Sequence, residues 1–263
     1  VSLYAQDHWA LSNRVSLDLD VRMVNVTSNA TGDIVGADTG AIVPRLGVSV
    51  DPVGDGRGVV QATWAHYSGK YGEAQFVRNT DVGNPSRVTY GYTGPAGQGF
   101  DFAPGMDPAN YTAVVSGSFP TANVSFDEDL SSPLTKEFTL STGREFGGGY
   151  GRVMYTWRRA SNFIDDFIDD PSADGKVQVV RNGVNFGIFD RVVYRNNEDT
   201  WREYQALQFM GRYPAFAALN VSGHYTVQLR NHGNFEGEAS NQPGLPSEFG
   251  DYPEILSASR NYP

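Results

Sequence analysis

The stretch VSLDLDVRM, residues 15–23, alternates apolar and polar side chains without one exception. Successive side chains of a β-strand point to opposite faces, whereas a helix needs a period of 3.6 residues. The stretch therefore predicts a strand with one apolar and one charged face. Residues 219–230 (LNVSGHYTVQLR) show the same alternation and predict a second such strand.

Six further segments alternate less regularly, and all eight together predict a chain of about eight strands. Most of them approach the roughly ten residues that a tilted strand needs to cross a bilayer. The six segments are residues 3–9, 45–50, 59–67, 138–144, 152–158 and 205–213.

Composition narrows the class of protein. The 263 residues carry a net charge of -10, and a chain this acidic is a poor partner for nucleic acid, which we exclude. Aromatic residues make up 13%, with 30 Gly and 14 Pro, as is typical of turn-rich β proteins. The absence of cysteine excludes a disulfide scaffold and thiolate metal sites. No run approaches the ~18 apolar residues of a spanning helix, so a helical membrane protein is excluded, whereas a membrane β-barrel is not.

The connections between the predicted strands alternate short and long. Short turns are expected at residues 12–13, 51–58, 146–149 and 213–215, and long polar connections at residues 27–43, 68–132, 165–200 and from 232 onward. This arrangement is typical of an up-and-down outer-membrane barrel, with periplasmic turns and extended extracellular loops. Residues 68–132 are then a long extracellular loop, and Ser12, Gly54, Gly148 and Pro214 are periplasmic.

The barrel interpretation assigns the two faces. Lipid is expected to contact the apolar set: Leu17, Leu19, Val21, Leu140, Val153, Tyr155, Leu207, Phe209, Val221, Tyr225 and Val227. An aqueous lumen is expected to contact the polar set: Asp18, Asp20, Arg22, Arg152, Arg158, Gln208, Arg212, Asn220, Thr226 and Gln228. The alternative is a soluble sandwich whose apolar faces meet in a dry core.

Four segments resemble hairpins of TonB-dependent outer-membrane receptors, nearest to those with a carboxypeptidase-regulatory-like N-terminal domain. YAQDHWALSNRVSLDLDVR (4–22) is similar to their aromatic-x-Gln-Asp-x-Trp strand and Ser-Asn turn. VPRLGVSVDPVGDGRGVVQATWAHY (43–67) is similar to their PRLG and GDG hairpin. SSPLTKEFTLSTGREFGGGYGRVMYTWRR (131–159) and REYQALQFMGRYPAF (202–216) resemble two more.

The resemblance implies a barrel of about 22 strands, closed inside by an N-terminal plug, in a bacterial outer membrane. Such a receptor imports a scarce nutrient, a siderophore, vitamin or glycan, using energy from an inner-membrane complex that acts through the plug. We expect this chain to be an internal fragment of the barrel wall, without plug or closing strands, and to need no cofactor.

The long loop at 68–132 holds the candidate ligand-binding residues, because binding residues concentrate on loops held by rigid scaffolds. Aromatic rings stack on sugars or flat chelates, and cationic side chains attract anions. The candidates are Tyr71, Phe76, Arg78, Arg87, Tyr90, Tyr92, Phe100, Phe102 and Tyr111. The alternative is that these rings pack the loop upon itself.

Motifs for other chemistry are sparse. No phosphate-binding glycine loop, GxSxG motif or HExxH pair occurs, so we expect no enzyme activity. Asp169, Asp170 and Asp174 form a weak candidate cation loop, but their spacing departs from the DxDxDG pattern of calcium loops. The other functions left open are a soluble carbohydrate-binding sandwich and a small adhesive eight-stranded barrel.

A solubility measurement separates the membrane interpretations from the soluble one. A barrel wall exposes apolar side chains and unpaired strand edges to water, so the purified chain is expected to aggregate unless detergent is present. Size-exclusion chromatography with and without detergent checks this. A folded monomer in plain buffer would contradict both membrane interpretations.

Overall fold

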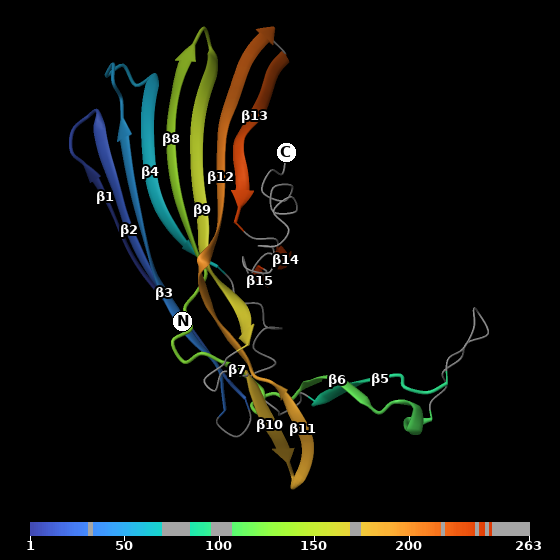
Figure 1. Ribbon diagram of the computed structural model, residues 1–263. Helices are drawn as coiled ribbons and strands as arrows, with labels where there is room; N and C mark the ends of the chain where they lie inside the picture. Colours follow the sequence, from blue (N-terminus) through green and yellow to red (C-terminus); the bar gives the residue numbers. More distant parts are fainter. Residues whose placement is uncertain are drawn as a thin grey trace.

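The computed structural model describes residues 1–30, 34–69, 85–95, 107–168, 175–216, 219–234, 237–239 and 242–243. Eight long strands form one antiparallel sheet in chain order (Figure 1). They are β1 (Ser2–Ala10), β2 (Val15–Ala30), β3 (Ile34–Val50), β4 (Gly58–Ser68), β8 (Leu134–Phe146), β9 (Gly149–Ile168), β12 (Val192–Phe216) and β13 (Leu219–Gly233). This confirms the eight predicted strands and their order.

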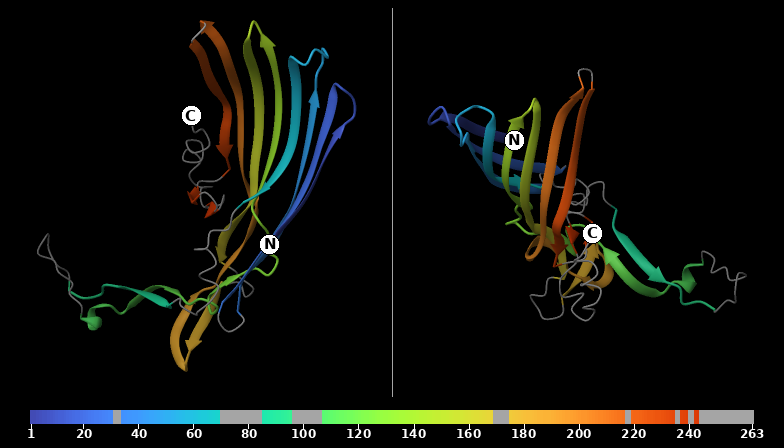
Figure 2. Two further views of the ribbon diagram at one scale, coloured as in Figure 1. Left: turned by 180° about the vertical axis from the view of Figure 1, so that it is seen from behind. Right: turned by 90° about the horizontal axis from the view of Figure 1, so that it is seen from above.

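The sheet is one curved layer, and β1 and β13 form its two edges (Figures 1 and 2). Within the described residues, no second sheet packs on the apolar face, so the sandwich alternative is wrong. Side chains that a soluble protein would bury are exposed there: Leu3 is 67% exposed, Phe216 75% and Tyr225 68%. The wall therefore has no dry core of its own, as expected of a sheet whose apolar side faces hydrocarbon.

The register of the strands places apolar residues in one set of rows and mostly polar residues in the rows between them. Leu17 lies opposite Trp9 and Val48, and the same row continues through Leu140, Tyr155, Leu207 and Val227. Because directly opposite residues share a face, one continuous apolar row crosses all eight strands. The neighbouring row, which includes Asp18, Thr63, Thr139 and Gln228, lies on the other face. The structure thus reproduces the predicted division of faces.

Short turns join the strands at one end, which we call the short-turn end; it lies at the top of Figure 1. Gly147 and Gly148 both have positive φ, as a two-residue hairpin turn requires. The predicted turn around Pro214 is wrong by a few residues, because β12 continues to Phe216 and Pro214 lies opposite Asn220. A register shift between Pro214 and Phe216 accommodates the proline in the strand.

The predicted long connections contain much more strand than expected. Residues 27–43 were expected to form a loop, but β2 and β3 stay paired from Val15 to Ala30. The connection at 165–200 holds the end of β9, the hairpin of β10 (Lys176–Arg181) and β11 (Val184–Asp190), and the start of β12. Asp, Asn and Gly in these segments obscured the alternation, whereas cross-strand pairing decided the structure.

Residues 68–132 hold β5 (Arg87–Gly91), a short 3-10 helix η3 (Pro108–Asn110), β6 (Ala113–Ser118) and β7 (Val124–Phe126). β5 pairs with β6, and β7 pairs in parallel with β12. The β5–β6 hairpin projects sideways from the long-connection end of the sheet, opposite the short turns (Figures 1 and 2). β14 (Gly237–Ala239) and β15 (Gln242–Pro243) form a small separate ladder.

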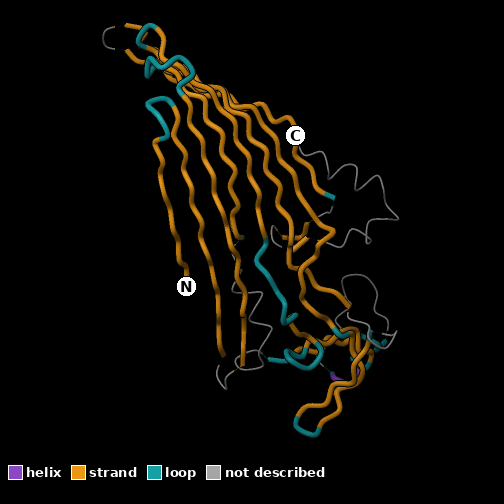
Figure 3. The backbone as a smooth tube through the Cα atoms, turned by 90° about the vertical axis from the view of Figure 1, so that its left-hand side faces the viewer, coloured by secondary structure: helices purple, strands orange, loops and turns teal. Residues whose placement is uncertain are grey.

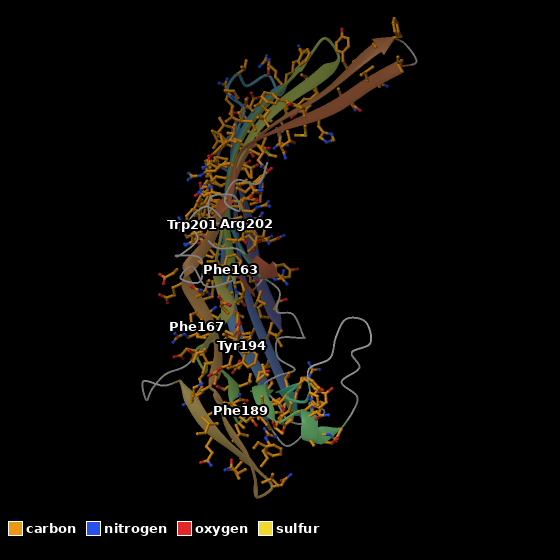
Figure 4. The ribbon with its side chains drawn as sticks, turned by 45° about the vertical axis from the view of Figure 1, so that its right-hand side comes forward. Phe163, Phe167, Phe189, Tyr194, Trp201 and Arg202 are labelled. Atoms are coloured by element: carbon orange, nitrogen blue, oxygen red, sulfur yellow. The ribbon has the colours of Figure 1, made fainter. Side chains whose placement is uncertain are left out.

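A bend at an irregularity of β9 and β12 divides the wall from this second region; Figure 3 shows the long strands of the wall side by side. Asn162, with a φ of +60°, lies opposite a bulge between Asn197 and Trp201. The Asn196 side chain links three segments here: its Oδ1 accepts from the Ser131 N–H at 2.7 Å, and its Nδ2 donates to the Asn162 carbonyl at 3.1 Å. Beyond the bend, side chains pack as in a soluble protein (Figure 4).

Two apolar clusters form the core beyond the bend. One contains Val124, Leu130, Ile164 and Tyr194, and the other contains Phe119, Val179 and Phe189.

Among the described residues, no helix is long and apolar enough to cross a membrane.

The turn after β3 allows a test of local electrostatics. The Asp51 carboxylate accepts from the backbone N–H of Gly54 at 2.8 Å and of Gly56 at 2.7 Å. These two hydrogen bonds hold the pKa of Asp51 below its ordinary value of 3.8. A depressed carboxyl pKa stabilises the turn above the ordinary pKa, and this stabilisation is lost as the pH falls through the lowered value.

Asp51→Ala is therefore expected to raise hydrogen exchange at Gly54 and Gly56 about tenfold near neutral pH, since charge-assisted bonds are lost. The difference from the parent protein should shrink as the pH falls below 3.8 and vanish below the lowered pKa of Asp51, where both turns lack the carboxylate. Exchange at matched pH, read by mass spectrometry, checks this. Asp55→Ala, in the same turn, is the control that should leave these two amides protected.

Candidate ligand-binding surfaces

The lumen face carries a polar network across five neighbouring strands. Arg45 on β3 lies 3.7 Å from Asp20 on β2 and stacks over the Tyr67 ring, 5.0 Å from its centroid. The Tyr67 hydroxyl donates to Glu137 on β8 at 3.3 Å. Glu137 also accepts from the Arg158 Nε on β9 at 2.8 Å. Opposite charges thus alternate along the row, which offsets the cost of placing them on a partly buried surface.

A concave region lies on this face between β1 and β4. Its polar lining includes His8, Asp18, Asp20, Arg45 and Tyr67. The His8 ring pairs with Asp18 at 2.7 Å. Two buried atoms, Asp20 Oδ1 and Arg45 Nε, have no hydrogen-bond partner within the described part of the chain. Because both atoms are buried, their missing partners are a local energetic cost inside the network.

Nearer the short turns, a guanidinium on the lumen face is bonded to neutral side chains. Arg152 on β9 donates to Ser141 at 2.9 Å and to Gln61 at 3.3 Å, and Gln61 donates to Ser49 at 3.2 Å. The lumen face is thus polar over most of the wall, which suits an aqueous or protein-filled interior rather than lipid.

The β5–β6 hairpin, which we call the arm, presents two of the candidate ligand residues directly. Val88 packs against the Phe119 cluster, whereas Arg87 beside it is exposed. Tyr90 is 49% exposed and lies at a register shift between Thr89 and Tyr90. A ring and a guanidinium thus lie three residues apart on an exposed strand. Because β5 alternates regularly, they lie on opposite faces, so the ring offers stacking and the guanidinium anion attraction at separate positions.

Tyr92 and Tyr111, which the sequence places 19 residues apart, meet at the outer part of the arm. Their ring centroids are 5.5 Å apart in an edge-to-face arrangement, and the Tyr92 hydroxyl donates to the Pro95 carbonyl at 2.9 Å. The backbone N–H of Thr93 donates to the Asn110 carbonyl at 2.6 Å and closes the two segments together. This half-buried pair agrees with both candidate roles, which are contact with a ligand and packing within the loop.

The arm is attached through Asn123, a residue that sequence reasoning did not identify. Its buried Oδ1 accepts from the Phe119 N–H at 2.7 Å, and its Nδ2 donates to the Gly117 and Asp190 carbonyls, each at 2.9 Å. A Cβ at Gly117 would come within 2.3 Å of the Phe189 ring, so only glycine allows the arm to approach this closely. No sequence signal marks this site, because its partners are backbone atoms of distant segments.

The remaining candidates lie outside the described residues: Tyr71, Phe76, Arg78, Phe100 and Phe102 of the loop, and Asp169, Asp170 and Asp174 of the proposed cation loop. Nearby, Asp165 is buried and accepts from Asn197 Nδ2 at 3.3 Å. The described residues hold no cluster of three or more His, Asp or Glu side chains suited to a metal ion.

Comparison with known proteins was made by sequence and by structure. No protein-family model matches the chain, and no curated protein matches it. The siderophore receptor PirA from Acinetobacter baumannii aligns with 87% of this chain and 27% of its own, at 11% identity and a TM-score of 0.53. The outer membrane transporter YddB from Escherichia coli aligns with 94% of this chain and 26% of its own, at 13% identity and a TM-score of 0.54.

A mutant of the ferric enterobactin receptor PfeA from Pseudomonas aeruginosa aligns with 87% of this chain and 26% of its own, at 14% identity and a TM-score of 0.50. At such identities the likeness shows the fold alone. The fold is an antiparallel up-and-down membrane β-barrel wall, here eight consecutive strands of a larger barrel. The chain spans about a quarter of the length of these structures.

Asn123→Leu tests how the arm is held. The change leaves the Phe119 N–H and two carbonyls without a partner, which is expected to weaken the attachment by ~2 kcal/mol or more. Limited proteolysis within residues 85–95 should then become about thirtyfold faster, while the wall strands stay resistant. Asn185→Ala, at an exposed position near the start of β11, is the control and should leave the cleavage rate unchanged. Uniform loss of resistance would contradict a local role.

Proposed function

We propose that this chain forms part of the barrel wall of an outer-membrane receptor that binds and imports a scarce nutrient. The observation that carries the proposal is the division of the sheet into an apolar outer face and a charge-paired inner face, with an aromatic arm at the long-connection end. Receptors and transporters of the outer membrane share this fold at low identity and over part of their length. The activity is transport, not an enzymatic reaction.

In this proposal the long-connection end is extracellular, and the short turns are periplasmic. Arg87, Tyr90, Tyr92 and Tyr111 then lie where a ligand arrives. Tyr71, Phe76, Arg78, Phe100 and Phe102 belong to the same stretch of sequence and remain candidates for ligand contact. A siderophore is the first ligand class to test, because flat chelates with anionic groups suit tyrosine rings and a guanidinium. Vitamins and glycans are the next classes.

The lumen face supports a second part of the proposal. A plug domain in the lumen would meet the concave region around Asp20 and Arg45, whose polar lining suits contact with a polar protein surface. Such a plug would link the receptor to an energising complex of the inner membrane. Lipid of the outer membrane would cover the apolar face.

Ligand titration of the membrane-inserted protein tests the proposal. The panel contains a ferric catecholate, a ferric hydroxamate, cobalamin and an oligosaccharide. One class is expected to bind, and the double variant Arg87→Gln/Tyr90→Ser should weaken it about tenfold, because a stacking contact and a cation are lost. Tyr213→Ser changes a similarly exposed tyrosine, 51% exposed, at the opposite end of the wall.

Equal weakening by the Tyr213 variant would contradict binding at the arm. Binding of none of the four classes would contradict the nutrient-receptor proposal itself.

A further inference from the structure

On β4, β8 and β9 the side chains of the outer face change from aromatic to basic within two residues. Trp64 lies opposite Phe138, and Phe138 lies opposite Trp157, so three aromatic side chains form one row across three strands. The rings of Trp64 and Trp157 stack with centroids 5.9 Å apart. Aromatic rings of this kind collect at the boundary between hydrocarbon and headgroups. The row therefore marks the level at which the wall leaves the hydrocarbon.

The next row toward the long-connection end is basic. His66 lies opposite Lys136, and Lys136 lies opposite Arg159. These three residues follow the aromatic row by two positions on each strand, so they share its outer face and lie about 7 Å beyond it. We call His66, Lys136 and Arg159 the basic row.

Like charges directly opposite each other on a sheet destabilise it. The lumen face avoids this arrangement, because Arg158 pairs with Glu137 and Arg45 pairs with Asp20. On the outer face, neither Lys136 nor Arg159 forms an ion pair within the described part of the chain. Lys136 and Arg159 thus place two positive charges side by side that no ion pair of the described protein neutralises.

On β12, the residue that follows the basic row is a carboxylate. Glu203 lies opposite Arg159 but is buried and already accepts from Gln205 at 2.7 Å and pairs with Arg230 at 3.3 Å. Arg159 instead stacks over the Trp201 ring, with its Cζ 4.8 Å from the centroid. Trp201 lies at the bend of the sheet (Figure 4), which fixes the guanidinium at this level.

We propose that the basic row binds the phosphate group of a lipid headgroup at the membrane boundary. Charge complementarity selects an anion, and the position beyond the aromatic row, on the lipid side of the wall, selects a lipid as its source. The Arg159 guanidinium offers a bidentate fork to phosphate, and the Lys136 ammonium adds a point charge beside it. This site differs from the arm and from the lumen. It depends on the membrane placement of the wall and not on which nutrient is imported.

Native mass spectrometry of the detergent-solubilised protein tests the site with two probes: diphosphoryl lipid A and the same lipid without its phosphates. The parent protein is expected to retain the phosphorylated lipid preferentially. Lys136→Gln/Arg159→Gln should weaken that retention about thirtyfold, as the loss of two cations at a membrane surface implies.

The matched control is Arg22→Gln/Arg202→Gln, which removes two cations from the lumen face and makes the same change in net charge. It should retain the phosphorylated lipid as the parent does. Equal weakening by both double variants, or equal retention of the two lipids by the parent, would overturn the proposal. Retention of neither lipid would instead contradict the membrane placement on which it depends.

Discussion

An open sheet with one wholly apolar face has to be covered by something, and this requirement organises the molecule. The apolar row from Trp9 to Val227 is continuous across eight strands and meets no second layer of described protein. In contact with hydrocarbon, such a face has no free-energy cost of exposing apolar side chains to water. Pairing between neighbouring strands satisfies the backbone hydrogen bonds there. The polar face then has to neutralise itself, which it does through the network from Asp20 to Arg158.

The bend at Asn162 separates two kinds of packing. On the wall side, buried apolar residues are few, and those most deeply buried, such as Ala206, are mostly small. On the other side, Phe119, Ile164 and Tyr194 form cores like those of a soluble protein. A single long strand such as β12 therefore belongs both to the wall, with its exposed apolar face, and to a region with a packed core. The described part of the arm is attached on the side with the packed core, where loops can vary without disturbing the wall.

Strand order and face assignment followed from the sequence because period-two alternation is local and strict in residues 15–23 and 219–230. Strand ends did not, because β2, β3, β9 and β12 are extended by pairing between distant segments with weak alternation of their own. The turn near Pro214 was misplaced for another reason: proline usually marks a turn, but a register shift at the strand end accommodates it.

The sequence by itself determined that the chain is a β protein whose strands have one apolar and one charged face. Both the alternation and the charges can be read from consecutive residues. It also identified Tyr92 and Tyr111 as residues of interest, but not that their rings meet. Only the tertiary structure decided that Asn123 holds the arm and that Lys136 lies directly between His66 and Arg159. Register is the physical reason: which residues lie opposite each other depends on pairing across tens of residues, and no local pattern encodes it.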